Sequence, residues 1–313
     1  MDKLHKFHSI DNYKSSNHIS SYECYYKDWV VMEKVHGCNF SFTTDGKDVL
    51  MGRRNSFLSN ELEENAFYKV NIHMNKYKQI IRDIHKYIGG DNVVTIYGEL
   101  FGGNSIIMKT IQSSIFYCPT YEFYAFDIRV VDKYLDYDRC IEIFERFGLF
   151  YAKPLFRGKF DVCIAWSNEH KHDVTTIPVQ LGLSDSNLTM SNNIREGHVI
   201  KPVVPAYYND GKNIAFKDKS DKFLEKQDVV KVNTEVAAEH LSYVTHQRLD
   251  NVISKIGDID VIKQNKKNIK VIFGLYVTDV LQDMIADGVY IDDIATKNLN
   301  SYIMTNMILP LFK

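Results

Sequence analysis

The sequence predicts an α+β fold in two parts: a first domain, residues 1–232, of antiparallel sheets with flanking helices, and a smaller all-helical domain at 233–313. Two observations support this. From Trp29 to about Glu225, short runs of β-branched and aromatic residues alternate with turn residues, as is typical of antiparallel strands. After about Val232 the apolar residues recur at helical spacing. A chain of 313 residues is long enough to form two domains.

The first domain opens with strand-like runs at residues 29–34, 39–44 and 48–51. All three carry the β-branched or aromatic residues that strands favour. The residues at 44–47, Thr-Asp-Gly-Lys, are typical of a hairpin turn between the second and third runs. We therefore expect a compact β meander at the start of this domain.

A long amphipathic helix is predicted after the meander. Asn60 and Glu63 form a plausible capping pair, the apolar positions continue to Ile88, and the glycines at 89–90 are expected to end the helix. The polar segment 168–193 favours no particular element. The other predicted elements are strands at 94–100, 121–131, 196–204 and 213–219, a helix capped by Asp138 and running through Phe147, and C-terminal helices at 234–256, 261–286 and 291–311.

The composition is that of an ordinary globular protein. Hydrophobic residues make up 45% and charged residues 25%, which excludes a disordered or fibrous chain. With 38 basic and 40 acidic residues, the formal net charge is only −2. The chain as a whole therefore does not attract nucleic acid, and any basic surface for such a partner must be local.

The cysteines and the apolar segments indicate the compartment. The 5 cysteines are odd in number, widely spaced and never in a CxxC pair, which argues against both a disulfide framework and a zinc knuckle. Residues 1–20 lack the apolar core of a secretory signal, and no stretch approaches the roughly 18 apolar residues needed to span a bilayer. We expect an intracellular, cytoplasmic protein with no membrane partner.

The first candidate for chemistry is Lys34, which lies at the end of an apolar strand and precedes Gly37. Neither a GxxxxGK[ST] loop nor a GxGxxG turn occurs, so a bound nucleotide would need another device. A lysine at the end of a strand can point into a pocket. A lone KxxG is nearly uninformative, however, and it gains meaning only together with other motifs in the chain.

Five more motifs occur after Lys34 in a fixed order. They are 52–55 (Gly-Arg-Arg-Asn), 97–101 (Tyr-Gly-Glu-Leu-Phe), 123–128 (Phe-Tyr-Ala-Phe-Asp-Ile), 196–202 (Glu-Gly-His-Val-Ile-Lys-Pro) and 216–219 (Phe-Lys-Asp-Lys). With these motifs the chain resembles the RNA ligase 2 family of covalent nucleotidyltransferases, which includes phage RNA ligase 2 and the trypanosome RNA-editing ligases. His36 stands where DNA ligases and mRNA capping enzymes usually place Asp. The resemblance spans about residues 29–225 and implies a nucleotidyltransferase domain of the ATP-grasp-like ligase type.

The resemblance also implies a catalytic set. Lys34 would be the nucleophile that forms a lysyl-AMP bond, and Lys217 and Lys219 would contact the α-phosphate of ATP. Strand alternation places both of these amines on one face. Glu196 would hold Mg²⁺ through water, with Mn²⁺ able to substitute. His36, also implied to be catalytic, would act mainly after AMP has been attached.

The remaining residues implied by the resemblance surround the nucleotide. Glu99 would accept a hydrogen bond from a ribose hydroxyl, and Phe126 would stack on adenine. Arg54 would contact ribose or phosphate, although Arg53 is an alternative. The other members of the implied nucleotide-binding set are Glu33, Asn39 and Lys201, of which Asn39 and Lys201 would act mainly after AMP attachment.

The chemistry imposes its own demand on the site. A lysine amine attacks phosphorus only when neutral, and an unperturbed lysine with a pKa of about 10.4 is neutral in roughly one molecule in a thousand near pH 7.4. We expect nearby cations to disfavour the ammonium form of Lys34. Arg54, Lys217, Lys219 and a bound Mg²⁺ are the available ones.

These expectations describe an ATP-dependent RNA ligase, acting as a monomer, that joins RNA ends bearing a 5′-phosphate and a 3′-hydroxyl, with a nicked duplex as the expected substrate. A DNA ligase or a capping-type nucleotidyltransferase is the first alternative, and an inactive module that binds RNA ends is the second. His36 and the helical C-terminal segment favour RNA joining, because the first alternatives usually append a β-barrel OB-fold.

Overall fold

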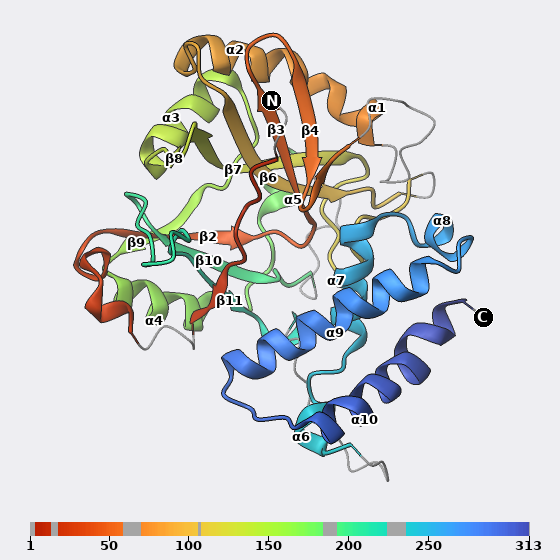
Figure 1. Cartoon of the computed structure of the whole chain (residues 1–313). Coiled ribbons are helices and arrows are strands. Elements are labelled where there is room, and N and C mark those ends of the chain that lie inside the picture. The colour runs from red at the N-terminus through yellow and green to blue at the C-terminus, as the bar shows by residue number, and fades with distance from the viewer. Residues whose placement is uncertain are drawn as a thin grey trace. The chain divides into compact units, whose positions relative to one another are not determined.

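The computed structural model divides the chain into two compact units, Met1–Lys222 and Phe223–Lys313 (Figure 1). The predicted domain boundary at 232/233 lies outside the described residues. The structure describes residues 4–13, 18–58, 70–105, 108–183, 193–223 and 236–312.

The described residues of the first unit form a five-stranded and a six-stranded sheet, with strand orders β1-β11-β10-β2-β9 and β5-β4-β3-β6-β7-β8. All strand pairs are antiparallel except β1 with β11. The predicted α+β class with antiparallel sheets is confirmed. The strands of the first sheet are β1 (Asp11–Asn12), β2 (Trp29–Lys34), β9 (Pro154–Gly158), β10 (Gly197–Pro202) and β11 (Phe216–Lys219); those of the second are β3 (Cys38–Thr44), β4 (Val49–Arg53), β5 (Ser56–Phe57), β6 (Val94–Gly102), β7 (Tyr121–Val130) and β8 (Lys133–Tyr134).

The prediction of a three-stranded meander was wrong. β3 and β4 form the expected hairpin, with Thr44 opposite Val49, but β2 pairs with β10 and β9 in the other sheet. The alternation of residues identifies a strand without identifying its partner, so the sequence could not reveal this change of sheet. The chain crosses between the sheets at residues 35–37. A Cβ atom on Gly37 would lie 2.2 Å from the carbonyl oxygen of Leu100, so the crossing requires glycine.

Helices cover one side of each sheet (Figure 1). The six-stranded sheet packs its apolar face, including Phe42 and Phe123, against Ile81 of α2 and Ile143 of α3. The five-stranded sheet packs Trp29 and other apolar residues against α4. The helices of this unit are α1 (Val70–Met74), α2 (Lys78–Ile88), α3 (Tyr137–Phe147), α4 (Phe160–His170) and α5 (Ile177–Gln180).

Two helices of this unit differ from the prediction, one in its continuity and one in its start. The long helix expected from Asn60 to Ile88 is interrupted by a 3-10 turn, Asn75–Tyr77, while Asn60 and Glu63 lie outside the described residues. Asp136, rather than Asp138, occupies the N-cap position of α3. Asp138 lies in the first turn of α3 and forms an ion pair with Arg157. The local sequence does not predict this ion pair, because the two residues come from different elements.

The described part of the second unit is entirely helical, as predicted. Its core includes Tyr276 and Val280 of α9 and Ile303 of α10. Asp258 and Asp292 cap α8 and α10 through their side chains, which accept hydrogen bonds from the backbone N–H groups of Asp260 and Ala295. None of the described helices is both long and apolar enough to cross a membrane. The helices are α6 (Ala238–Leu241), α7 (His246–Ile256), α8 (Ile259–Lys263), α9 (Asn268–Ala286) and α10 (Asp293–Ile303), followed by a π turn (Met304–Ile308) and a 3-10 turn (Leu309–Phe312).

Candidate active site

One face of the five-stranded sheet carries four of the predicted site lysines. In the register of β10, Gly197 lies opposite both Lys34 and Lys219, and Val199 lies opposite Lys217. Residues directly opposite each other in an antiparallel pair share a face, as do residues two apart on one strand. Lys201 lies two positions beyond Val199. Lys34, Lys201, Lys217 and Lys219 therefore project from the same side of the sheet.

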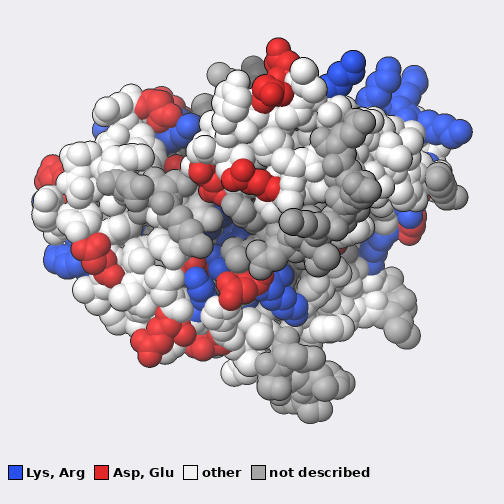
Figure 2. All heavy atoms as spheres, turned by 90° about the horizontal axis from the view of Figure 1, so that it is seen from below, with Lys and Arg blue, Asp and Glu red and all other residues white. Residues whose placement is uncertain are grey.

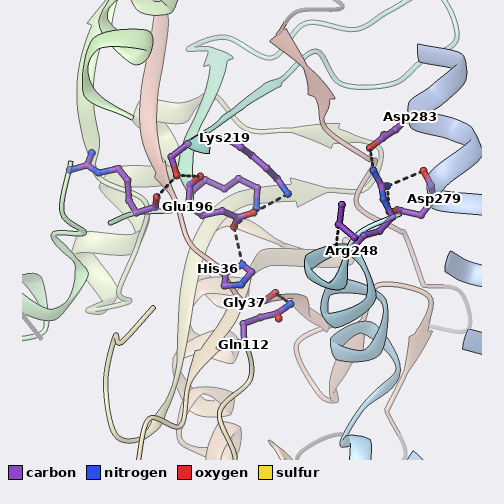
Figure 3. A network of polar contacts seen from close by, with 12 residues as sticks. His36, Gly37, Gln112, Glu196, Lys219, Arg248, Asp279 and Asp283 are labelled. Carbon is purple, nitrogen blue, oxygen red and sulfur yellow. Dashed lines mark hydrogen bonds and ion pairs between the residues drawn. The ribbon is translucent and has the colours of Figure 1, made fainter. Parts of the chain in front are cut away.

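Glu196 lies beside Lys34 and Lys219 of this lysine face, directly before β10. Its Oε2 accepts a hydrogen bond from Lys34 Nζ at 2.8 Å and lies 3.4 Å from His36 Nδ1. Its Oε1 lies 3.2 Å from Lys219 Nζ. Figure 3 shows His36 and Lys219 converging on this carboxylate from different strands and loops. Three residues of the predicted catalytic set thus meet at one carboxylate.

The charge state of Glu196 is set by this arrangement. Burial alone would raise the pKa of its carboxyl, but the ammonium groups of Lys34 and Lys219 outweigh burial and hold the pKa well below its usual range. Glu196 is therefore ionised at neutral pH although its side chain is only 3% exposed. The side chain of Lys34 is 21% exposed, which leaves its amine accessible to a substrate.

Lys201 forms a second buried pair that joins the two sheets. Its Nζ bonds to the carboxylate of Asp127 on β7 and to the carbonyl oxygen of Phe126 at 3.2 Å. Burial raises the pKa of Asp127, and Lys201 opposes that rise. The lysine face of the five-stranded sheet is thereby tied to the strand that carries the predicted adenine-stacking residue.

Glu99, Asn39 and Phe126 come from the six-stranded sheet. Asn39 and Glu99 lie directly opposite each other on β3 and β6, so their side chains share a face. Tyr124 lies opposite Glu99 on β7. Phe126 falls where the register between β6 and β7 shifts, and it is half-buried.

The sequence did not foresee that residues near the start of the chain contact this region. The ring of Phe7 lies 4.9 Å from that of Phe126, and Arg54 donates a hydrogen bond to Ser9 Oγ at 2.7 Å. Arg53, the alternative to Arg54, instead bonds to Ser56 Oγ at 2.9 Å.

The structure does not bring Glu33 to the lysine face. Alternation along β2 directs its side chain to the opposite side of the sheet from that of Lys34. There its carboxylate accepts hydrogen bonds from the hydroxyl of Thr175 and from the backbone N–H of Thr176, the latter at 3.1 Å. Burial raises the pKa of Glu33. Its backbone carbonyl remains near the other sheet, accepting a hydrogen bond from Tyr124.

Asp127 is a residue of this region that the sequence reasoning overlooked, although a signal was present. It is a carboxylate within an apolar strand motif, directly after Phe126. A charge predicted to be buried needs a partner of opposite sign. The basic residue in the 196–202 motif, Lys201, could have been proposed as that partner.

Comparisons with known proteins agree with this architecture. The profile of the RNA ligase family matches residues 27–219, and the chain belongs to that family. A second profile, described as T4 RNA ligase 2 C-terminal, matches residues 226–307 and supports the RNA ligase 2 branch.

Two curated relatives are RNA-editing ligases of a trypanosome. The chain is 32% identical to mitochondrial RNA-editing ligase 2 of Trypanosoma brucei brucei over 205 residues, which cover 56% of this chain and 48% of the relative. It is 26% identical to mitochondrial RNA-editing ligase 1 from Trypanosoma brucei brucei, over 83% of this chain and 71% of that protein. The chain therefore spans about half the length, 48%, of the first of these relatives.

Solved structures share the fold. The RNA ligase of Naegleria gruberi with PPi superposes with a TM-score of 0.50 at 17% identity, covering 71% of this chain and 57% of that one. A mutant of the same ligase with ATP and Mn gives a TM-score of 0.50 at 17% identity, over 71% of this chain and 58% of that one.

Proposed function

We propose that this chain is an ATP-dependent RNA ligase that carries AMP on Lys34. The observation that carries the proposal is the convergence of Lys34 and Lys219 on the buried, ionised carboxylate of Glu196. A nucleophilic amine is held at a defined point, at the end of a strand and partly exposed. Cationic groups on the same face supply the charge that phosphoryl chemistry requires.

In the first step, Lys34 Nζ attacks the α-phosphorus of ATP. A P–N bond forms, the P–O bond to pyrophosphate breaks with pyrophosphate leaving as the anion, and the amine releases a proton to solvent. In the structure this amine donates a hydrogen bond to Glu196 Oε2 at 2.8 Å, which occupies the nitrogen. The pair must therefore open before the attack. We assign the binding of the α-phosphate oxygens during the displacement to Lys217 and Lys219, which share a face of the sheet.

The residues present fit a divalent cation held mainly by water and phosphate. No group of three or more His, Cys, Asp or Glu side chains suited to holding a metal occurs among the described residues, while Glu196 offers one ionised carboxylate on the lysine face. Mg²⁺ commonly uses one or two carboxylates together with substrate phosphates. When bound, it would neutralise charge on the leaving pyrophosphate. Glu196 would hold the water shell of that ion through its carboxylate oxygens.

In the later steps AMP passes from Lys34 to the 5′-phosphate of RNA, and a 3′-hydroxyl displaces it to form the phosphodiester. We assign to His36, beside Glu196, and to Lys201, beside Asp127, a role in the steps on the adenylated RNA end. We propose a nicked duplex as the substrate and a monomer as the active form. All five cysteines are free and buried, which is consistent with a reducing compartment such as the cytoplasm.

A local basic surface supports a polyanionic partner. Lys and Arg side chains gather in a few places on the face shown in Figure 2. One cluster, called here the lysine patch, comprises Lys263, Lys266, Lys267 and Lys270 at the junction of α8 and α9. All four are exposed, and none has an ion-pair partner among the residues that the structure describes. The overall net charge of −2 required that a nucleic-acid surface be local, and the patch meets that requirement.

Labelling with ATP tests the proposal. The wild-type protein, incubated with Mg²⁺ and ATP labelled at the α-phosphate, should acquire label that resists denaturation, and Lys34→Ala should acquire none. Lys47→Ala is the matched control, because Lys47 is an exposed lysine at the β3–β4 turn. Label in Lys34→Ala equal to that in the control would refute the assignment.

A chase of the labelled protein separates the alternatives. Release of label with sealing of nicked RNA, and little sealing of nicked DNA, supports an RNA ligase. Preference for nicked DNA, or labelling by GTP in place of ATP, would indicate the DNA ligase or capping-type alternative. The described part of the second unit holds only helices, which disfavours an OB-fold there. If neither ATP nor GTP labels the protein, the remaining alternative is an inactive module that binds RNA ends.

A further inference from the structure

A chain of polar side chains, buried except for the partly exposed Lys171, runs behind the site on the opposite face of the five-stranded sheet. Ser167 of α4 lies between two strands: its Oγ is 2.8 Å from Asp218 Oδ2 on β11 and 2.9 Å from His198 Nδ1 on β10. His198 Nε2 is 3.1 Å from a terminal nitrogen of Arg195, and Lys171 Nζ is 3.1 Å from Asp218 Oδ1. These five residues are called here the Ser167 network.

The donors and acceptors of the network can be oriented in only one way. The carboxylate of Asp218, paired with Lys171, only accepts, so the hydroxyl of Ser167 donates to it. The oxygen of Ser167 then accepts from His198 Nδ1–H, and His198 Nε2 accepts from Arg195. His198 is therefore neutral, with its proton on Nδ1. Burial, with Arg195 adding to its effect, lowers the pKa of His198 to about 3, which agrees with this assignment.

The network shares its strands with the proposed catalytic residues. Arg195 and His198 flank Glu196 and Gly197, and Asp218 separates Lys217 from Lys219. Side chains on a strand alternate between faces, so the network and the site use neighbouring positions of the same backbone. Ser220 ties the two strands at this point, its backbone N–H donating to the carbonyl of Glu196 at 2.9 Å. A loss of the network that shifts the register of β10 against β11 would therefore displace Glu196 relative to Lys219 on the other face.

Stability alone does not account for a polar network at this place. Ser167 and His198 are 0% exposed and Asp218 is 2% exposed, so all three groups lose hydration on folding. Apolar residues of similar volume often give equal or greater stability in such positions. Hydrogen bonds differ from apolar contacts in being directional, so they fix one arrangement of the elements that they join.

We propose that Ser167, His198 and Asp218 are positioning residues for the transfer of AMP to Lys34. The bridge from α4 holds β10 and β11 in the register that places Glu196 between Lys34 and Lys219. This inference rests on the proposed function. A displacement of about 1 Å at a reacting group can slow a reaction about 100-fold, so a small shift of these strands would be measurable.

Ser167→Ala tests the role, because it removes the bridging hydroxyl and leaves His198 Nδ1 and Asp218 Oδ2 without it. The matched control is Thr43→Val in the six-stranded sheet of the same unit, where the buried hydroxyls of Thr43 and Thr95 lie 3.1 Å apart. The measurements are the single-turnover rate of Lys34 labelling at saturating ATP and Mg²⁺, the ATP concentration giving half that rate, and the folded fraction at the assay temperature.

We expect Ser167→Ala to label at least about ten-fold more slowly per folded molecule at saturating ATP, with a smaller change in the half-saturating ATP concentration. The labelling rate of Thr43→Val per folded molecule should stay within about two-fold of the wild-type rate, even if Thr43→Val loses as much thermal stability as Ser167→Ala. A rate for Ser167→Ala that falls only in proportion to its folded fraction, or no further than that of the control, overturns the proposal.

A second pair of variants covers the case in which Ser167→Ala does not fold. His198→Gln keeps an N–H donor and an oxygen acceptor, whereas His198→Leu keeps only the volume. The proposal requires that Gln retain several-fold more labelling per folded molecule than Leu, and equal rates contradict it. Absence of labelling in the wild-type protein refutes the ligase proposal and this inference together. Wild-type labelling with no selective loss in these variants refutes the positioning role alone.

Discussion

Replacement of Glu196 by Gln removes the charge at the centre of the site with almost no change in shape. Loss of one partner from a buried ion pair costs about 3–5 kcal/mol. Two features reduce that figure here: the Lys34 side chain is 21% exposed and can recover hydration, and the amide retains an oxygen acceptor for Lys219. We therefore expect Glu196→Gln to lower the free energy of unfolding by about 1–3 kcal/mol at pH 7.

The effect should depend on pH with a defined sign. The pKa of Glu196 is depressed in the folded protein, so its ionisation contributes stability that is present above the unfolded pKa of about 4.3. That contribution is lost as the pH falls through the lower, folded pKa. The difference in unfolding free energy between wild type and Glu196→Gln should be constant from about pH 6 to 8 and should shrink at acid pH.

Denaturant unfolding of both proteins at pH 7 and at the lowest pH where both remain folded measures this difference. Glu122→Gln is a control on the six-stranded sheet, because Glu122 pairs with Lys76 away from the lysine face. The same two proteins should also differ in Lys34 labelling, with Glu196→Gln slower by about 100-fold or more. The assigned ion-pair geometry would be refuted if Glu196→Gln and wild type had the same free energy of unfolding at pH 7 and at acid pH.

Three further predictions concern other parts of the chain. Lys201→Ala should reduce sealing of pre-adenylated nicked RNA by about ten-fold more than it reduces Lys34 labelling, measured in parallel single-turnover assays, and the reverse order would contradict the role given to Lys201. Arg248→Met should lower the free energy of unfolding of the second unit by about 3 kcal/mol in denaturant unfolding, because the Arg248 side chain is 1% exposed and pairs with Asp279 and Asp283. A loss below about 1 kcal/mol would show that these pairs contribute little. Alanine at all four positions of the lysine patch should reduce the slope of log affinity for nicked RNA against log salt by about two to four and leave Lys34 labelling unchanged. The charge-matched control replaces the exposed Lys47, Lys86, Lys133 and Lys153 by alanine. An unchanged slope in the patch variant, or an equal change of slope in the control, would exclude the patch as an RNA surface.

The sequence was sufficient to predict the fold class and the strands that carry the site, for local reasons. Alternation in the 216–219 segment is enough to place Lys217 and Lys219 on one face, and the register of β10 with β11 agrees. The helical spacing after residue 236 similarly reflects a property that each helix carries in its own sequence.

Long-range pairings could not be predicted in the same way. Nothing in the residues 29–44 indicates that β2 leaves its neighbour β3 for another sheet, because strand partners are chosen by the packing of the whole unit. The pairing of Lys201 with Asp127 joins residues 74 positions apart. The hydrogen bonds of Glu33 to Thr175 and Thr176 depend on a loop that the sequence left unassigned. A resemblance between motifs identifies residue types at a site without showing which face each side chain adopts.

The most direct test of the account is to locate the AMP adduct. The wild-type protein should be incubated with ATP and Mg²⁺, digested under alkaline conditions that preserve a P–N bond, and its peptides analysed by mass spectrometry. We predict AMP on the peptide that contains Lys34, removed both by added pyrophosphate and by nicked RNA. An adduct on another lysine, or AMP that neither pyrophosphate nor nicked RNA removes, would contradict the central claim.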